Sequence, residues 1–294
     1  AMLEGSKEFA KAFMQRHNIP TARYASFGSD QLSEAIAALD KFKAPYVIKA
    51  DGLAGGKGVI ITESKQEAAK TLEAMLKGGA FNEAGKRVVI EEFLAGQEVS
   101  MFVVTDGKSY HILPSAKDYK RIGEGDTGLN TGGMGAISPV PYLSEEFQQK
   151  ALNQIIIPTI KGLTKDEIPY HGFVFFGLMK VGSDPYVIEY NCRMGDPETE
   201  VVLPRIKSDL LHLFENLCSG LLSEYDLEID ERAATTVVMA SSGYPGSYDI
   251  NFEIKGAEAD AKWDGVVFHC GTKMSRRKLY TNGGRVLAVT GRGA

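Results

Sequence analysis

Two segments of the sequence combine residue types that suit the handling of phosphate groups and a divalent cation. The first, residues 52–58, is glycine-rich, contains Lys57 and follows Lys49. Glycines let backbone N–H groups approach a ligand closely, and lysines add positive charge beside them. The spacing and the missing Ser or Thr exclude a Walker A motif. The segment therefore predicts a phosphate-binding loop of another kind or a flexible hairpin, and Lys49 either contacts phosphate or reaches water from a strand edge.

The second segment contains Glu189 and Asn191 at the end of an expected strand. Alternate residues of a strand face the same side, so these two side chains are expected to point together, with Cα atoms about 7 Å apart. Two oxygen ligands suit Mg²⁺, which also keeps water and phosphate ligands, and a solvated strand face is the alternative. The charged, turn-rich segment 192–200 follows, which favours a site, and its Arg193 suits two-point contact with a phosphoryl group.

Two other segments are weaker on their own. Residues 123–135 hold many glycines and almost no apolar side chains, so they predict a disordered loop or a binding lid, with composition slightly favouring disorder. Residues 91–98 combine a strand end, an apolar pair, a turn and Glu98, a pattern that would suit an adenine slot beside a carboxylate for ribose.

The elements that must position these segments alternate between helical and β-rich patterns, which indicates an α/β or α+β class. Ser6 is expected to cap the first helix, and Ser64 with Glu67 forms a capping box for the third. From about residue 231 the chain reads as a smaller β-rich unit. Expected helices cover about residues 6–17, 30–42, 64–77, 144–162 and 209–219; expected strands cover 46–49, 59–61, 88–92, 98–104, 109–114, 173–181, 186–191, 235–240 and 286–290.

Composition narrows the function classes. The net charge of −5 disfavours nonspecific nucleic-acid binding, although the cluster at residues 117–121 could attract a small anion. No stretch approaches the roughly 20 apolar residues of a membrane span, the first residues do not form a signal peptide, and three isolated cysteines do not predict a disulfide framework. We expect a cytoplasmic protein with no membrane or nucleic-acid partner, and none of its five histidines lies in a motif.

Taken together and in this order, the motifs resemble the ATP-grasp superfamily and, more closely, the phosphoribosylamine–glycine ligase family. The matching stretches are residues 3–7, 47–59, 125–136 and 189–200, and the third is specific to this ligase family. The resemblance implies an α+β ATP-grasp fold, in which two α/β subdomains enclose ATP, over residues 1–230. The smaller lid subdomain would occupy about 45–105, and a partial β-rich C-terminal domain would occupy 231–294.

The resemblance also implies a reaction. ATP would phosphorylate the carboxylate of glycine, and the amine of 5-phosphoribosylamine would then attack the acyl phosphate, giving glycinamide ribonucleotide, ADP and phosphate. Family members carry an additional N-terminal domain and extend beyond the strand near Thr290, so the sequence is expected to be part of a longer protein, monomeric or dimeric. It departs from the family pattern at Lys117, Tyr119 and Leu129, beside the presumed substrate loop.

Site residues follow from the same resemblance, position by position. Lys7 and Lys49 would contact the phosphates of ATP, and Gly55, Gly56 and Lys57 would form a mobile flap. Glu189 and Asn191 would hold Mg²⁺ or Mn²⁺. Arg193, Lys57 and Asp126 are the catalytic candidates. The adenine slot would be lined by Glu91, Phe93 and Leu94, with Glu98 on the ribose, and the substrate loop would comprise Asp126, Thr127, Gly128, Asn130, Thr131, Gly132, Gly133 and Met134.

Two other functions remain as alternatives. Another ATP-grasp enzyme, such as a carboxylase subunit or a different carboxylate–amine ligase, would share Lys7, Lys49, Glu189 and Asn191 but not the glycine-rich stretch 125–135. A nucleotide-binding module that needs a further domain for turnover is the second alternative.

Overall fold

The computed structural model describes residues 2–54, 58–257 and 264–293 of the chain. These residues divide into two compact units. Unit 1 combines Ala1–Glu98 with Leu143–Arg193, and unit 2 combines Val99–Tyr142 with Met194–Ala294. Both units mix helices with antiparallel strands, so the expected α+β class is confirmed.

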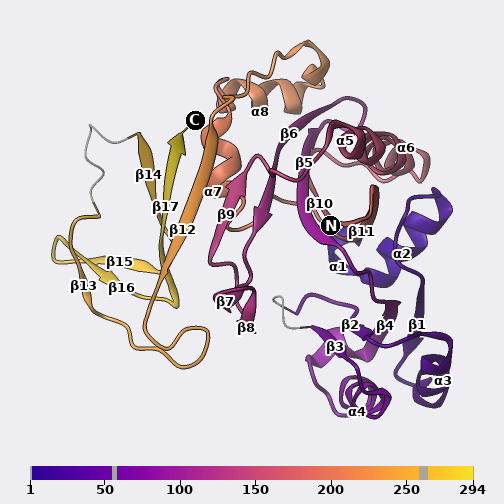
Figure 1. The fold of residues 1–294 in the computed structure, drawn as a ribbon. Helices are drawn as coiled ribbons and strands as arrows, with labels where there is room; N and C mark the ends of the chain where they lie inside the picture. The colour runs from indigo at the N-terminus through magenta and orange to yellow at the C-terminus, as the bar shows by residue number, and fades with distance from the viewer. Residues whose placement is uncertain (1, 55–57, 258–263, 294) are drawn as a thin grey trace. The chain divides into compact units, whose positions relative to one another are not determined.

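A four-stranded antiparallel sheet in unit 1 has the order β1-β4-β2-β3. Helices α3 and α4 cover one of its faces, and α2 lies on the other side (Figure 1). The covered face forms a core of Ile48 and Ala50 from β2, Val88 and Ile90 from β4, and apolar residues of both helices. The strands are β1 (Tyr24–Gly28), β2 (Tyr46–Ala50), β3 (Val59–Thr62) and β4 (Arg87–Glu92); the helices are α3 (Leu32–Ala38), continued by a 3₁₀ turn Leu39–Lys41, α4 (Lys65–Leu76), and a 3₁₀ turn Asn82–Lys86.

The helix caps expected from the sequence are present. Ser6 accepts a hydrogen bond from the Phe9 N–H at the start of α2 (Lys7–Arg16), which follows the short α1 (Met2–Gly5). Ser64 accepts one from the Glu67 N–H at the start of α4. Each cap satisfies an amide that has no partner within its helix, so the sequence fixes where these helices begin.

The rest of unit 1 contains a helical segment and a hairpin. The hairpin pairs β10 (Gly172–Val181) with β11 (Asp184–Asn191) in antiparallel register. The helix expected over residues 144–162 is present and continues to Lys165, with a π-helical stretch (Leu152–Ile156) between α5 (Glu145–Ala151) and α6 (Ile157–Lys165). Pro158 lies just after the π-helical stretch. Because proline has no amide hydrogen, it interrupts the regular hydrogen-bond pattern of the helix there.

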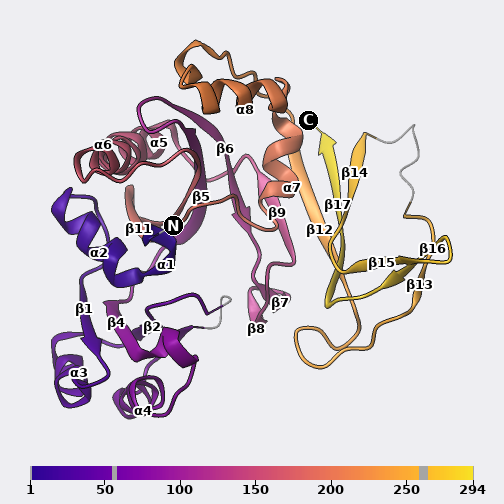
Figure 2. The same cartoon turned by 180° about the vertical axis from the view of Figure 1, so that it is seen from behind.

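Unit 2 is built on a sheet with the strand order β5-β6-β9-β12-β17-β14. Strands β12, β17 and β14 lie side by side, and a small sheet of order β13-β16-β15 lies at their lower end (Figure 2). The strands are β5 (Gln97–Thr105), β6 (Tyr110–Asp118), β9 (Gly135–Ser138), β12 (Ala233–Ala240), β13 (Glu253–Ile254), β14 (Gly265–His269), β15 (Thr272–Ser275), β16 (Lys278–Thr281) and β17 (Arg285–Gly293); the helices are α7 (Thr199–Val202), α8 (Leu210–Ser219) and 3₁₀ turns Leu203–Arg205 and Leu222–Glu224.

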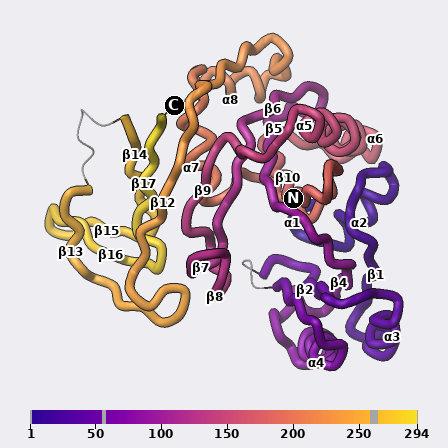
Figure 3. Tube along the Cα trace, in the orientation of Figure 1, coloured from indigo at the N-terminus to yellow at the C-terminus, as the bar shows by residue number. Residues whose placement is uncertain are grey.

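The glycine-rich segment 123–135 is ordered, so the slight preference for disorder drawn from its composition was wrong. Strands β7 (Arg121–Gly123) and β8 (Thr127–Asn130) pair as a short hairpin between β6 and β9 (Figure 3). Polar contacts replace the missing apolar core: Arg121 donates to the Gly128 carbonyl (2.6 Å) and Thr131 donates to the Lys120 carbonyl (2.8 Å). Residues 124–130, which form the turn and β8, are exposed.

None of the helices within the described residues is both long and apolar enough to cross a membrane.

Candidate nucleotide and substrate site

Strand alternation places two of the predicted site residues on the face of the four-stranded sheet that α3 and α4 leave uncovered. Ile48 and Ala50 of β2 face the helices, so Lys49 between them faces the opposite side. On β4, Ile90 faces the helices and Glu91 does not. The Lys49 ammonium lies 3.0 Å from Glu91 Oε1 and donates to the carbonyl of Ile188 on β11 (3.2 Å).

Lys7 at the start of α2 belongs to the same group of charges. Its ammonium donates to the Gly52 carbonyl (3.3 Å), at the start of the glycine-rich loop. Burial and then the charge of Lys49 lower the pKa of Lys7, while the carboxylates of Glu189 and Asp51 oppose that shift. The Lys7 N–H also donates to the Asp51 carbonyl just after β2 (3.2 Å), and Lys49 of β2 donates to the carbonyl next to Glu189, so Lys7, Lys49 and Glu189 share one region of unit 1.

Asp51 is a residue that the motif reading missed. Its carboxylate accepts hydrogen bonds from the Glu8 N–H (2.7 Å) and the Ser6 hydroxyl (3.1 Å), at the N-terminus of α2. A carboxylate at this end of a helix satisfies free amides and complements the helix dipole. These bonds hold the start of the glycine-rich loop to Lys7's helix. Gly55, Gly56 and Lys57 lie outside the described residues.

Glu189 and Asn191 lie on β11 as expected, with Tyr190 between them buried on the other face. Glu189 is exposed and Asn191 is half-buried, so both oxygens can reach a ligand. Carboxylate and amide oxygens fit a hard divalent cation, with phosphate and water completing its shell. Among the described residues, no group of three or more His, Cys, Asp or Glu side chains is arranged to hold a metal. A metal ion bound here would therefore take its ligands from Glu189, Asn191 and the nucleotide.

Arg193 follows the two predicted metal ligands and is anchored by Glu4, to which the motif reading gave no role. Glu4 Oε1 lies 3.1 Å from Arg193 Nε, and Glu4 Oε2 accepts the Cys192 N–H (2.9 Å). Arg193 also donates to Asn191 Oδ1 (3.3 Å). One carboxylate from α1 thus fixes both the backbone and the guanidinium of the turn that leaves β11.

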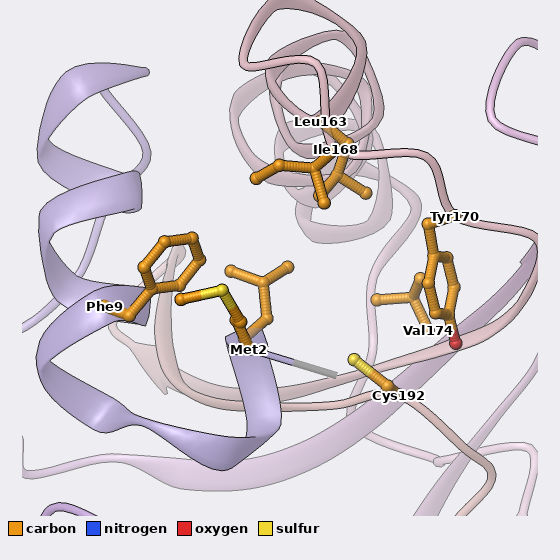
Figure 4. Close-up of a pocket in the computed structure, with 8 residues that line it drawn as sticks. Met2, Phe9, Leu163, Ile168, Tyr170, Val174 and Cys192 are labelled. Carbon is orange, nitrogen blue, oxygen red and sulfur yellow. The ribbon is translucent and has the colours of Figure 1, made fainter.

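A small apolar pocket lies behind this turn. The sulfur of Cys192 and the side chains of Phe9 and Val174 point into the same space (Figure 4). Its lining is almost wholly hydrocarbon, so it offers no charged group for a polar substrate. The apolar side chains that line it pack α1 and α2 beside the end of β11.

The residues predicted to line the adenine slot follow β4. Phe93 is 43% exposed, Leu94 is half-buried and Glu98 is half-buried. Glu91, in contrast, is 2% exposed and its carboxylate lies against two lysines. Its part in an adenine slot stays a prediction, as do those of the other three residues.

In unit 2 the loop at residues 131–134 is held at several points. Arg285 of β17 donates to the Gly132 carbonyl (2.8 Å) and makes a two-point contact with Asp196 (2.8 and 2.7 Å). The Tyr244 hydroxyl accepts the Gly132 N–H (2.9 Å). Gly133 has φ +106°, and a Cβ there would lie 2.3 Å from Pro197 Cδ, so only glycine fits. The segment 131–134 is therefore fixed by residues that lie far from it in the sequence.

Lys117 and Tyr119, two of the residues that depart from the family pattern, lie close together. The Lys117 ammonium lies 5.4 Å from the ring centroid of Tyr119 and 5.7 Å from that of Tyr142. A cation between two aromatic rings is held by both. Leu129, the third departure, lies on β8 and is 67% exposed.

Glu198 is a buried carboxyl in unit 2. It is 4% exposed and accepts a hydrogen bond from Ser100 (2.9 Å). Burial, with the nearby charge of Asp118, raises the pKa of Glu198 to about 7. The folded state therefore binds the Glu198 proton more tightly than the unfolded state does. This proton contributes its full stabilisation below about pH 4.5, the ordinary pKa of the group, and the contribution is lost as the pH rises through about 7.

Replacing Glu198 by glutamine is therefore expected to stabilise the protein at pH 8 by roughly 1–3 kcal/mol, because the amide carries no charge to bury. At pH 5 the two proteins should unfold with nearly equal free energies. Urea unfolding of both proteins at pH 5, 6.5 and 8 measures the difference. Exposed Glu215→Gln on α8 is the matched control. A difference for Glu198→Gln that does not grow with pH contradicts the assignment.

Comparison with known proteins first defines the class. A family model described as phosphoribosylglycinamide synthetase, ATP-grasp (A) domain, matches residues 5–199, and one for the C domain of the same synthetase matches residues 234–294. The biotin carboxylase domain of a Hydrogenobacter thermophilus 2-oxoglutarate carboxylase shares the fold with a TM-score of 0.73 at 17% identity, covering 99% of this chain and 62% of that one. The fold is thus ATP-grasp, as expected.

The particular family follows from closer relatives. The phosphoribosylamine–glycine ligase of Salmonella typhimurium is 50% identical over the whole chain, and that of Escherichia coli K12 is 49% identical; the chain spans 68% of each. A crystal structure of the ligase from Thermotoga maritima superposes with a TM-score of 0.87 at 40% identity, covering 100% of this chain and 72% of that one. The chain belongs to the phosphoribosylamine–glycine ligase family. This confirms the resemblance and does not favour a carboxylase.

Proposed function

We propose that this chain catalyses the ATP-dependent ligation of glycine to 5-phosphoribosylamine, a step of purine biosynthesis. The observation that carries the proposal is the group of Lys7, Lys49 and Glu189 in unit 1, in a member of this ligase family: Lys7 donates to the loop that follows β2, and Lys49 of β2 donates to the carbonyl of Ile188, the residue before Glu189. Two ammonium groups beside a carboxylate ligand suit a triphosphate and its cation.

The reaction proceeds in two displacements. A carboxylate oxygen of glycine attacks the γ-phosphorus of ATP, the bond to the ADP oxygen breaks, and glycyl phosphate forms. The amine of phosphoribosylamine then attacks the glycyl carbonyl carbon, the carbon–oxygen bond to phosphate breaks, and the amine loses a proton. Lys7 and Lys49 bind the phosphates, and Arg193, anchored by Glu4, stabilises the charge on the phosphoryl group during transfer.

Family membership implies a divalent metal, and Mg²⁺ or Mn²⁺ would be held by Glu189 and Asn191. When bound, the metal neutralises charge on the phosphate oxygens and aligns them. The exposure of Glu189, and of Asn191 in part, leaves their oxygens accessible for this purpose.

Other parts of the proposal rest on the family pattern. Gly55, Gly56 and Lys57 would close over the phosphates, and the exposed turn with Asp126 would meet the substrates. Phe93, Leu94 and Glu98 would surround the nucleoside, and Glu91, which is buried against Lys11 and Lys49, would form the base of that adenine slot without contacting the nucleoside. The ATP-grasp part would span residues 1–230, with its lid at about 45–105, and the C-terminal domain 231–294. We further propose a cytoplasmic protein, monomeric or dimeric, without a nucleic-acid partner.

The test is phosphate release from ATP by the full chain. Release should require glycine and phosphoribosylamine together, and bicarbonate should not replace glycine. Bicarbonate-dependent release without glycine would support a carboxylase instead. Nucleotide binding without any release would support a nucleotide-binding module.

Arg285→Lys is expected to raise the KM for glycine or phosphoribosylamine by about 10-fold, with little change in the KM for ATP. Lysine keeps the charge but cannot hold Asp196 with two parallel bonds and Gly132 as well. Steady-state kinetics with each substrate varied in turn separates these effects. The exposed Arg277→Lys is the control. Equal increases for all three substrates would contradict a role confined to the 131–134 loop.

A further inference from the structure

Lys11 carries a buried charge that none of the motifs accounts for. It projects from α2, is 2% exposed, and lies 3.0 Å from Glu91 Oε2. The ammonium also donates to the Thr21 hydroxyl (2.8 Å) and to the Ala22 carbonyl (3.3 Å). Its hydrogen-bonding capacity is therefore used within the protein, and it has no donor left for a ligand.

Glu91 joins Lys11 to the nucleotide site. Its second carboxylate oxygen lies 3.0 Å from the ammonium of Lys49, which also donates to the Ile188 carbonyl. One buried carboxylate thus lies between two ammonium groups. Burial alone would raise the pKa of Glu91, but Lys49 and Lys11 outweigh it and hold the pKa below its ordinary value. The three groups together carry one net positive charge.

That net charge depends on Lys11. Without Lys11, Glu91 and Lys49 would form a neutral pair, and the attraction of Lys49 for phosphate would be largely cancelled in a site of low dielectric. Glu91 would also pull Lys49 toward the sheet, since no second cation would share the carboxylate.

We propose that Lys11 is a positioning residue for nucleotide binding: it neutralises Glu91, so that Lys49 keeps its charge and its direction for the triphosphate. The inference rests on the proposed role of Lys49 as a phosphate contact. Thr21, which donates to the Val187 carbonyl (2.6 Å), holds the Lys11 ammonium beside β11 at the same time.

The ionisation of Lys11 gives the arrangement a pH dependence. Burial lowers the pKa of Lys11 to about 8, opposed by Glu91 and Glu92 on β4 and assisted by Lys49 on β2; the Tyr24 ring on β1 lies 5.6 Å away. Above about pH 8 Lys11 loses its proton and the group becomes neutral. Affinity for a triphosphate should therefore fall between pH 7 and pH 9.

Calorimetry with a non-hydrolysable ATP analogue and Mg²⁺ at pH 7 tests the proposal on the full chain. Lys11→Met should weaken binding at least 10-fold. The double variant Lys11→Met with Glu91→Gln should bind within about 3-fold of wild type, because no carboxylate then cancels the positive charge of Lys49. Exposed Lys70→Met on α4 should bind as wild type. A folded Lys11→Met with unchanged affinity, or a folded double variant as weak as the single one, would overturn the proposal.

Lys11→Arg keeps the test decisive if Lys11→Met fails to fold. Arginine keeps its proton at pH 9, so its affinity should change less between pH 7 and pH 9 than that of wild type. An identical pH dependence would overturn the neutralising role. Wild type that does not bind the analogue at all would instead refute the proposed function, on which the inference rests.

Discussion

Glu189→Ala should lower the affinity for a magnesium–nucleotide complex by about 100-fold or more, while metal-free nucleotide binds as before. Glu189 is exposed at the end of β11, so its removal leaves no cavity in the core. The loss would therefore come from the metal and not from unfolding.

Calorimetric titration of a non-hydrolysable ATP analogue, with Mg²⁺ and separately with EDTA, measures this difference. Glu73→Ala on the exposed side of α4 is the matched control and should show wild-type affinity in both conditions. Equal loss of affinity with Mg²⁺ and with EDTA would contradict a metal role. So would unchanged affinity for the magnesium complex in a folded Glu189→Ala protein.

Arg193→Ala is expected to reduce kcat on the order of 1,000-fold and to change the KM for ATP by only a few-fold. Arg193 is placed to meet charge that develops during phosphoryl transfer, and such an interaction acts mainly in the transition state. Its side chain is 57% exposed, so stability should hardly change.

Steady-state kinetics of phosphate release separates the two parameters, and Arg277→Ala serves as the control. Glu4→Gln should give a smaller loss in kcat, since the amide can still accept from the Cys192 N–H but no longer pairs with the guanidinium. A large increase in KM with unchanged kcat for Arg193→Ala would show that Arg193 binds ground-state nucleotide instead.

Local signals account for what the sequence predicts well. Ser6 and Ser64 mark helix starts because a cap needs only residues within the same turn. The β10–β11 hairpin is predicted by two strand-like runs and a turn between them, and strand alternation gives the shared face of Glu189 and Asn191. These features need no knowledge of distant contacts.

The residues that the sequence did not reveal act through partners far along the chain. Glu4 meets Cys192 across 188 residues, Asp51 meets Glu8 across 43, and Arg285 meets Gly132 across 153. Glu4 and Asp51 lie within stretches that match the family, and Arg285 does not, but in none of the three cases does a local pattern reveal the distant partner. Composition also misjudged residues 123–135, because side-chain bonds to backbone carbonyls can order a segment that has almost no apolar residues.

Oxygen-isotope transfer tests the central claim, that this chain joins glycine to an amine through glycyl phosphate. The full chain is incubated with Mg²⁺, ATP, phosphoribosylamine and glycine labelled with ¹⁸O in its carboxylate, and the released phosphate is examined by mass spectrometry. The proposed reaction transfers one carboxylate oxygen to phosphate, so each phosphate released should carry one ¹⁸O. Unlabelled phosphate from an active protein would mean that the carboxylate is never phosphorylated, and it would contradict the account.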